Sequence, residues 1–220
     1  MKKVLVVAPH PDDETLGCGG TLLKHKSRGD QIYWINVTNI KEENGYDADK
    51  VKTKNEQIAQ VNKEFGFDEF IDMGLNQTRL DESALGEMVG QFAEIFQRIQ
   101  PEIVILPYKF DVHSDHRTIF EAAYSCTKSF RYPFIKKVLM MEVLSETNFS
   151  VCTEGFSPNY FVDISDFMDK KIDIMKIYKQ EMGAHPFPRS EESIRALGVL
   201  RGSTVGCQYA ESFMVLRDVD

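Results

Sequence analysis

Residues 4–8 read Val-Leu-Val-Val-Ala and lead directly into Pro-His-Pro-Asp-Asp-Glu at residues 9–14. A continuous run of branched aliphatic residues is typical of a strand that is buried on both faces of a parallel sheet. Similar runs recur along the chain, with helix-like patterns between them. The expected strands cover 4–8, 32–37, 70–73, 103–106, 138–143, 160–162 and 213–216. The expected helices cover 15–26, 85–99, 115–127, 166–178 and 190–200, and a loop at 39–52 leads into a weaker helix that ends near residues 65–66.

This alternation predicts the fold class. Strands that alternate with helices form βαβ units, which assemble into a mostly parallel sheet with helices on both faces. We therefore expect an α/β protein with a doubly wound sheet. After about residue 145 the alternation becomes irregular, and we expect this C-terminal extension to fold over the sheet. Because no repeat or linker divides residues 1–220, we expect one domain.

Composition restricts the functional classes. The formal net charge of −8 argues against sequence-independent nucleic-acid binding, which needs a basic face to neutralise phosphates. No stretch approaches the roughly 20 apolar residues of a membrane helix, and the run at 4–8 is too short for a secretory signal. The four cysteines are scattered singly, which suits a reducing compartment. We expect a cytoplasmic protein that acts on a small molecule.

Two loops concentrate the residues that carry chemistry. Three of the five histidines lie in residues 9–14 and in residues 111–116, Asp-Val-His-Ser-Asp-His, together with several acids. Each loop follows a predicted buried strand. The carboxyl ends of parallel strands form the edge at which open α/β sheets bind ligands. The two loops are therefore expected to meet at one site.

The residue types in these loops predict a metal site. Imidazole nitrogen and carboxylate oxygen are zinc ligands, and a catalytic zinc site has three ligands and one position open to water. His10 and Asp13 lie three positions apart on a tight turn, and His116 would supply the third ligand. Spacing alone does not decide how His113 and His116 divide the work. The same ligand set also suits ferrous iron, so Zn²⁺ and Fe²⁺ are both open.

A hydrolase also needs a base and a group that stabilises negative charge on oxygen. Asp12, next to a ligand but not needed as one, is placed to be the base. His113 as an imidazolium would stabilise the oxyanion and protonate the leaving group, and Asp115 would hydrogen-bond one of the histidines. We expect His25, inside a lysine-flanked helix, to be structural. Three residues are candidates for substrate contacts: Arg79, Tyr108 and His185. For each of them, a structural or surface role is the alternative.

A non-catalytic module that binds a sugar or a nucleotide is the least favoured alternative. Three glycines at 17, 19 and 20 suggest a nucleotide site, but the dinucleotide fingerprint places its first glycine directly after the strand. Here the acidic PHPDDE turn occupies that position and would repel a pyrophosphate. Close packing of the following helix on the sheet explains the glycines better.

The two motifs together resemble those of the LmbE/PIG-L family of metal-dependent N-deacetylases, the N-acetylglucosaminyl deacetylases. The first family motif is A-H-P-D-D-E, so Pro9 replaces an alanine, and the second, H-x-D-H, is matched by residues 113–116. The resemblance spans roughly residues 2–143. The tail at residues 206–213, GCQYAESF, is similar to the end of bacterial members.

This resemblance implies a Rossmann-like three-layer sandwich and a zinc-dependent removal of an N-acetyl group, usually from a glucosamine-type sugar. At the matching positions it implies metal ligands His10, Asp13 and His116, with Asp12 as general base, His113 as acid or oxyanion stabiliser and Asp115 as its modulator. It also makes a homo-oligomer plausible. Hydrolysis of another small amide or an ester by the same site is the alternative.

Overall fold

The computed structural model describes residues 1–80, 85–150 and 155–220. Within these ranges, seven strands form one sheet in the order β3-β2-β1-β4-β5-β7-β6. They are β1 (Lys3–Ala8), β2 (Gln31–Asn39), β3 (Glu69–Asn76), β4 (Ile103–Leu106), β5 (Lys137–Met141), β6 (Tyr160–Asp163) and β7 (Ala210–Asp218). The first five pair in parallel, whereas β7 pairs antiparallel with both β5 and β6. The predicted α/β class with a mostly parallel sheet is confirmed.

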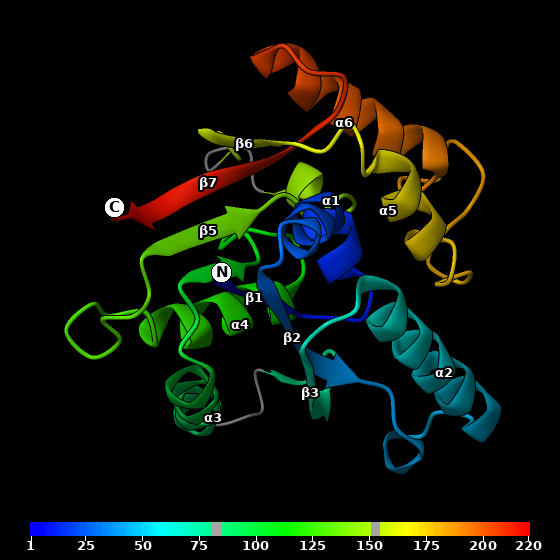
Figure 1. Cartoon of the computed structure of the whole chain (residues 1–220). Helices are drawn as coiled ribbons and strands as arrows, with labels where there is room; N and C mark the ends of the chain where they lie inside the picture. The colour runs from blue at the N-terminus through cyan, green and yellow to red at the C-terminus, as the bar shows by residue number, and fades with distance from the viewer. Residues whose placement is uncertain (81–84, 151–154) are drawn as a thin grey trace.

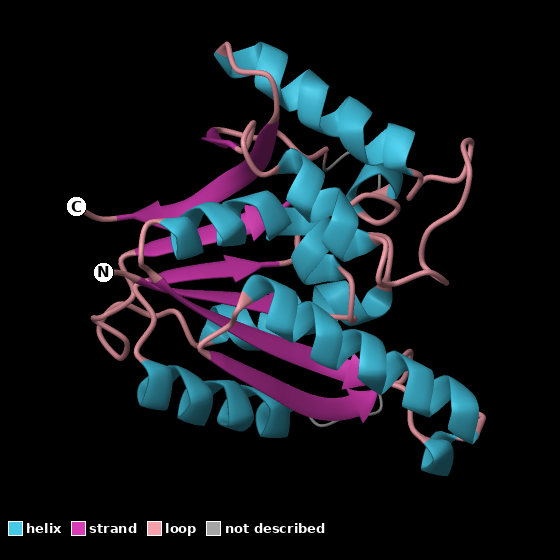
Figure 2. Cartoon of the chain, turned by 45° about the vertical axis from the view of Figure 1, so that its right-hand side comes forward, coloured by secondary structure: helices cyan, strands magenta, loops and turns pink. Residues whose placement is uncertain are grey.

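Helices cover both faces of the sheet (Figures 1 and 2). Helices α3 (Leu85–Ile99) and α4 (Ser114–Ser125) pack on one face, and the other face carries α1 (Asp13–Ser27), α2 (Ala48–Phe65), α5 (Met168–Met175) and α6 (Glu191–Val205). Each face of the sheet has its own hydrophobic core, and alternate residues of β1 pack in one or the other. Val4 and Val6 lie beneath α1, and Leu5 and Val7 face the other side. Residues 4–8 are all apolar because both faces of this strand are buried. In the part of the chain that the structure describes, no helix combines the length and apolarity needed to cross a membrane.

The C-terminal part is more regular than its sequence indicates. Strand β7 lies between β5 and β6, so this part extends the sheet as well as covering it. Helix α5 packs against α1, and α6 packs against β7. The apolar runs at 160–162 and 213–216 predict the two strands, but not their place in the sheet. That place depends on long-range pairing, which no local pattern records.

Helix α1 is bent and lies very close to the sheet. Cys18 interrupts its helical backbone with a φ of −150° and a ψ of 21°. A Cβ on Gly17 would lie 2.5 Å from Sδ of Met141, and a Cβ on Gly20 would lie 2.7 Å from Cγ2 of Ile164. A side chain at either position would force these neighbours to move. The glycines of this helix therefore serve close packing, in keeping with the sequence argument against a nucleotide site.

A buried ion pair from the C-terminal part holds the second half of α1. The carboxylate of Glu211 accepts hydrogen bonds from the backbone N–H of Gly20 at 2.8 Å and of Thr21 at 2.7 Å. The ammonium of Lys171 lies 2.7 Å from Glu211 and donates to the carbonyl oxygen of Leu16 at 2.8 Å. The two charged side chains are only 6% and 5% exposed. The end of the chain thus supports the helix that follows the PHPDDE turn.

We expect Glu211→Ala to lower the free energy of unfolding by about 3–5 kcal/mol, because it leaves the ammonium of Lys171 buried without its counter-charge. Urea unfolding measures this, with the fluorescence of the fully buried Trp34 as the signal. Lys176→Ala is the control, since its ion pair with Glu191 is exposed and such pairs contribute at most about 1 kcal/mol. Equally small losses in the two variants would contradict the supporting role of Glu211.

Candidate metal and catalytic site

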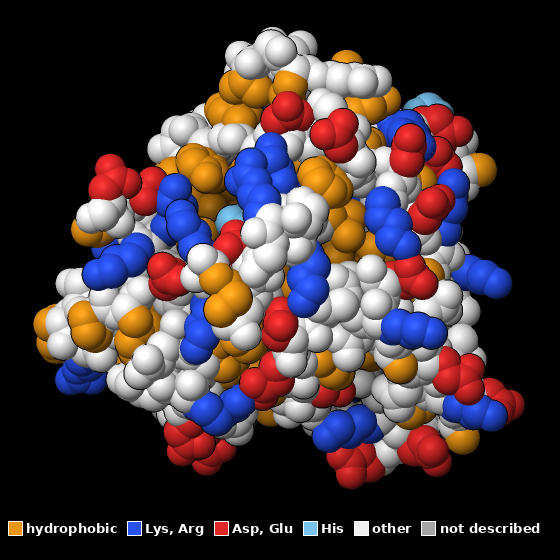
Figure 3. Space-filling view, viewed as in Figure 1, with side chains coloured by type: hydrophobic (Ala, Val, Ile, Leu, Met, Phe, Trp, Pro, Cys, Tyr) orange, Lys and Arg blue, Asp and Glu red, His pale blue; other side chains and the backbone are white. Residues whose placement is uncertain are grey.

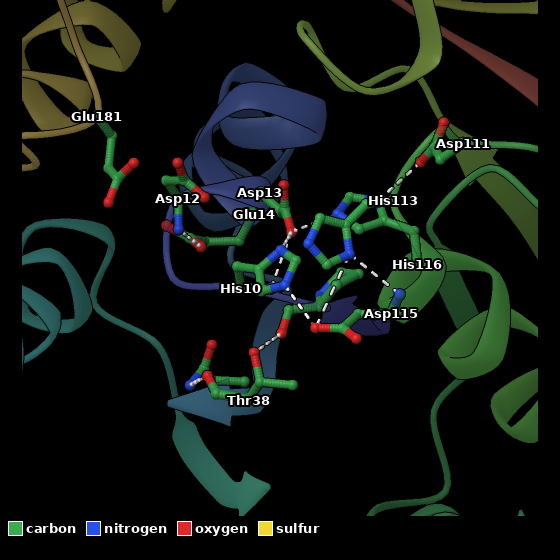
Figure 4. A network of polar contacts seen from close by, with 12 residues as sticks. His10, Asp12, Asp13, Glu14, Thr38, Asp111, His113, Asp115, His116 and Glu181 are labelled. Atoms are coloured by element: carbon green, nitrogen blue, oxygen red, sulfur yellow. Dashed lines mark hydrogen bonds and ion pairs between the residues drawn. The ribbon is translucent and has the colours of Figure 1, made fainter. Parts of the chain in front are cut away.

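The loop after β1 is held by the neighbouring strand. The carbonyl oxygen of Pro9 accepts hydrogen bonds from the backbone N–H of Thr38 at 3.0 Å and from its hydroxyl at 2.8 Å. Thr38 lies near the carboxyl end of β2, which fixes the loop at that edge of the sheet. The backbone N–H of His10 then donates to Oδ2 of Asp13 at 2.8 Å. This tight turn brings both side chains to one point (Figure 4).

Asp12 combines a strained backbone with a side chain that does not cap its helix. It is the N-cap of α1, with a φ of 139°, a region that costs a non-glycine residue about 1–3 kcal/mol. An aspartate at this position normally accepts a hydrogen bond from the first helical turn. The carboxylate of Asp12 makes no such bond, and its Oδ2 lies 2.7 Å from Nη1 of Arg189. It lines a cleft and is free for a role other than capping.

His116, in the first turn of α4, is fully buried between two carboxylates. Its Nδ1 lies 2.8 Å from Oδ2 of Asp111, whose Oδ1 accepts a hydrogen bond from the hydroxyl of Thr147 at 2.7 Å. Its Nε2 lies 3.2 Å from Oδ2 of Asp13, yet it has no hydrogen-bond partner among the described residues. A carboxylate on Nδ1 fixes the proton there in the neutral ring, which leaves the lone pair of Nε2 facing the centre of the site.

His10 connects the two motifs. Its Nε2 lies 3.0 Å from Oδ2 of Asp115, and its Nδ1 lies 3.5 Å from Oδ2 of Asp13. Oδ2 of Asp115 also accepts a hydrogen bond from the backbone N–H of Thr78, at 2.8 Å, in the loop after β3. The same oxygen is 3.8 Å from Nδ1 of His113. The histidine to which Asp115 bonds most closely is therefore His10.

The hydrogen bonding of His113 defines its tautomer. His113 is the N-cap of α4, and its Nδ1 accepts a hydrogen bond from the backbone N–H of Asp115 at 3.0 Å. An accepting Nδ1 carries no proton, so the proton of the neutral ring is on Nε2. Burial and the neighbouring His10 lower the pKa of His113, and the positive end of the α4 dipole also disfavours the imidazolium. The structure favours a neutral donor over the imidazolium that the sequence argument assumed.

The charges of the site favour a bound cation. Burial opposes protonation of His116, but the carboxylates of Asp13 and Asp111 raise its pKa well above its usual range. Burial opposes protonation of His10 as well, but hydrogen bonds to Asp115 and Asp13 raise its pKa to about 9. The acids thus stabilise positive charge at this point. A divalent ion bound at this point would supply that positive charge in place of protons.

The side chains also fit a metal ion geometrically. One ligand atom each from His10, Asp13 and His116 lie within 4.8 Å of one another. The buried Nε2 of His116 needs a partner that the described protein residues do not provide, and a metal ion would be one. His10, His113 and Asp115 form a second group of this size, but this second group lacks the buried, unpartnered Nε2 of His116. The first group is the better metal site.

A cleft of about 630 Å³ lies against this group of residues. Its walls are the loop after β1, helix α2 and the segment between α5 and α6 (residues 176–190), and it extends to Glu146 beyond β5. Figure 4 shows Asp12 on the side of the histidines that faces Glu181. A cleft of this volume suits a small-molecule ligand.

The residues singled out in the sequence fall into two groups. Those that the structure brings into one connected cluster are His10, Asp13, His113, Asp115 and His116, and Asp12 lies beside this cluster in the lining of the cleft. Tyr108 is 2% exposed and packs in the core beside Phe110 and Phe156. Arg79 and His185 are exposed, and none of these three lines the cleft. Their predicted substrate contacts gain no support from their positions.

Sequence reasoning missed four residues near the site. Asp111 was detectable, because it opens the same strand-end loop as the second motif and carries a carboxylate. Glu181 and Arg189 lie in an irregular segment far from both motifs, where no spacing marks them. Glu146 follows β5, and its Oε2 is buried without a hydrogen-bond partner among the described residues. Burial raises the pKa of Glu146.

Comparisons with known proteins agree with this geometry. The family model PIG-L, described as GlcNAc-PI de-N-acetylase, matches residues 5–127, more than half of the chain and both motifs. A diacetylchitobiose deacetylase from Thermococcus kodakarensis is 26% identical over 229 residues, which cover 96% of this chain and 82% of that protein.

Solved structures share the fold over the whole chain. The conserved protein TT1542 from Thermus thermophilus has a TM-score of 0.79 and 25% identity, with 100% of this chain and 97% of that chain covered. The N,N'-diacetylchitobiose deacetylase from Pyrococcus horikoshii, in complex with its inhibitor MPG, has a TM-score of 0.77 and 21% identity, with 98% and 84% covered. The resemblance inferred from the two motifs is confirmed: this chain belongs to the PIG-L family of LmbE-like de-N-acetylases.

Proposed function

We propose that this protein is a metal-dependent hydrolase that removes an N-acetyl group from an amino sugar or a sugar conjugate. The observation that carries the proposal is the buried Nε2 of His116, which has no hydrogen-bond partner among the described residues and faces Asp13 beside His10 at the edge of a small-molecule cleft. Membership of a de-N-acetylase family supports the reaction type. Two similar proteins are named as deacetylases of diacetylchitobiose, which supports an N-acetylated sugar as the substrate.

The lining of the cleft also supports a sugar. Neutral hydrogen-bonding side chains face it from several elements: Asn39, Thr53, Gln57, Gln77 and Gln180. Amides and hydroxyls both donate and accept, which matches the many hydroxyl groups of a sugar. On the face shown in Figure 3, acidic and basic side chains are interspersed rather than gathered by sign. That face offers no basic stripe of the kind that binds nucleic acid.

In the proposed mechanism, the metal ion, Asp12 and His113 have separate roles. Zn²⁺ or Fe²⁺ held by His10, Asp13 and His116 would, when bound, lower the pKa of water and polarise the acetyl carbonyl. Asp12 would accept a proton from the attacking water as its oxygen bonds to the acetyl carbon. His113 would donate a hydrogen bond from Nε2–H to the carbonyl oxygen as that oxygen gains negative charge. When the C–N bond breaks, the proton held by Asp12 would pass to the leaving nitrogen, giving acetate and a free amine.

Acetate release from a panel of N-acetylglucosamine derivatives tests this proposal. The protein is assayed as purified, after removal of metal by a chelator, and after addition of Zn²⁺ or Fe²⁺. We expect release that chelation abolishes and metal restores. Bound metal without release from any derivative would favour another small amide or an ester as the substrate. Sugar binding that survives chelation, with no turnover, would favour a binding module, and failure to bind metal after reconstitution would overturn the proposal.

A further inference from the structure

A chain of charged side chains crosses the cleft and ends on Asp12. Lys54, in α2, lies 2.7 Å from Oε1 of Glu181. Oε2 of Glu181 lies 3.4 Å from Nη1 of Arg189, and the same Nη1 lies 2.7 Å from Oδ2 of Asp12. All four residues line the cleft. The segment at residues 176–190 thereby reaches the catalytic turn from the opposite wall.

The backbone beneath Arg189 is well fixed. The next residue, Ser190, is fully buried and is the N-cap of α6, where its hydroxyl accepts a hydrogen bond from the backbone N–H of Ser193 at 3.1 Å. Farther back, Gln57 of α2 donates to the carbonyl oxygen of Ile177 at 3.0 Å and to Oε1 of Gln180 at 2.7 Å. Arg189 therefore approaches Asp12 from a segment that is anchored at both ends.

The carboxylate of Asp12 needs such an external partner. It does not cap α1, and the backbone of Asp12 is strained. Strained residues keep their conformation only where the surroundings fix it. The backbone N–H of Asp12 donates to Oε2 of Glu14 at 3.0 Å, whereas its side chain accepts a hydrogen bond from Arg189. The guanidinium is thus the group that sets where this carboxylate points.

The positive charge of Arg189 is already balanced by neighbouring carboxylates, so it is not available to bind an anionic substrate. Its guanidinium lies beside two carboxylates, those of Asp12 and Glu181, and the nearby ammonium of Lys54 is itself paired with Glu181. The local balance is neutral at best. A phosphate or carboxylate on the substrate would have to displace one of these ion pairs. The geometry therefore favours a role within the protein over direct recognition of an anion.

We propose that Arg189 is a positioning residue that holds the carboxylate of Asp12 in the orientation needed to accept a proton from water. The proposal rests on the role of Asp12 given above and extends the site beyond residues 5–127, the range that the family model matches. By this account, the irregular C-terminal segment supplies part of the catalytic geometry as well as a wall of the cleft.

Variants of Arg189 separate positioning from substrate binding. We expect Arg189→Ala and Arg189→Gln to lower kcat by about 10–100-fold, the usual effect of removing a partner that orients a functional side chain. KM and metal content should change little, because substrate and metal contacts remain. Arg189→Lys should restore part of kcat. Arg195→Ala is the control, since Arg195 pairs with Asp169 and Glu191 away from the cleft. An unchanged kcat, or a rise in KM alone, would overturn the proposal.

A double-mutant cycle tests whether Arg189 acts through Asp12. If it does, Arg189→Ala should cost little further activity once Asp12→Asn is present. In the metal-free protein, Arg189→Ala and Asp12→Ala should likewise shift the urea midpoint non-additively, because either substitution removes the hydrogen bond between the two side chains. Additive losses in both measurements would overturn the proposal and leave the role of Asp12 intact. A fully active Asp12→Asn would instead show that the proposed role of Asp12 is wrong, and the inference with it.

Discussion

Asp12→Asn should lower the rate of N-acetyl hydrolysis by about 10²–10⁴-fold, the usual contribution of a general base. The asparagine side chain has the same shape, and its oxygen can still accept the hydrogen bond from Arg189. What is lost is the ability to take a proton from water. The measurement is kcat for acetate release, together with metal content by elemental analysis, which should equal that of the unmodified protein.

Asp49→Asn is a matched control for this substitution. Asp49 also lines the cleft, but it is exposed and belongs to the first turn of α2 rather than to the PHPDDE turn. Its substitution removes the same charge from the same cleft and should leave kcat near its original value. Comparable losses in the two variants would point to a general electrostatic effect of the cleft instead of proton transfer by Asp12.

His116→Ala should lose the metal and the activity together. The imidazole is fully buried, and its Nε2 is the ligand atom with no protein partner among the described residues. Replacing a residue that merely orients a metal ligand weakens metal binding by about 10–100-fold. Removing the ligand itself should therefore weaken metal binding by more than that. A competition titration with a coloured chelator measures the affinity, and elemental analysis measures the metal that remains after purification.

His25→Ala is the corresponding control for a histidine. His25 pairs with Asp30 at 2.8 Å, on a part of α1 remote from the cleft. We expect it to retain metal and activity, which would show that loss of an arbitrary imidazole is not enough. If His116→Ala bound metal as tightly as the unmodified protein, the ligand set proposed above would be wrong.

The core of the site was predictable because it is encoded in two short motifs. His10, Asp12 and Asp13 lie within one turn, and that turn follows a strand whose burial is evident from its composition. His113 and His116 follow a second strand of the same kind. Since parallel strands expose their carboxyl ends at one edge, local sequence and sheet geometry together place these side chains near one another. No knowledge of the distant chain is needed for that step.

The partners of these residues were not predictable in the same way. Asp115 bonds most closely to His10, and Asp111 bonds to His116. Both pairings depend on how the turn before α4 is oriented. Arg189 reaches Asp12 from a segment that has no regular pattern. Each of these contacts is set by tertiary packing, and a sequence motif records only the residues that are close along the chain.

The fold shows the same division between local and long-range information. Buried apolar runs identify the parallel strands β1 and β4, since both faces of each are covered. The residues of β7 do not predict that it lies antiparallel between β5 and β6. The support of α1 also has a distant source, since the carboxylate that receives the N–H groups of Gly20 and Thr21 comes from Glu211. Sequence reasoning explained the glycines of this helix but not their partner.

The support that Glu211 gives to α1 has a consequence for protein synthesis. Glu211 lies 191 residues after Gly20, so the ribosome makes it long after the PHPDDE turn and α1. The edge of β5 and the second half of α1 must therefore wait for a segment that is translated much later, with apolar surface open to aggregation in the meantime. A chain whose translation stops before Glu211 would carry both motifs and still lack the means to complete the helix behind them. The support behind the PHPDDE turn thus arrives late in synthesis, once β7 has been made.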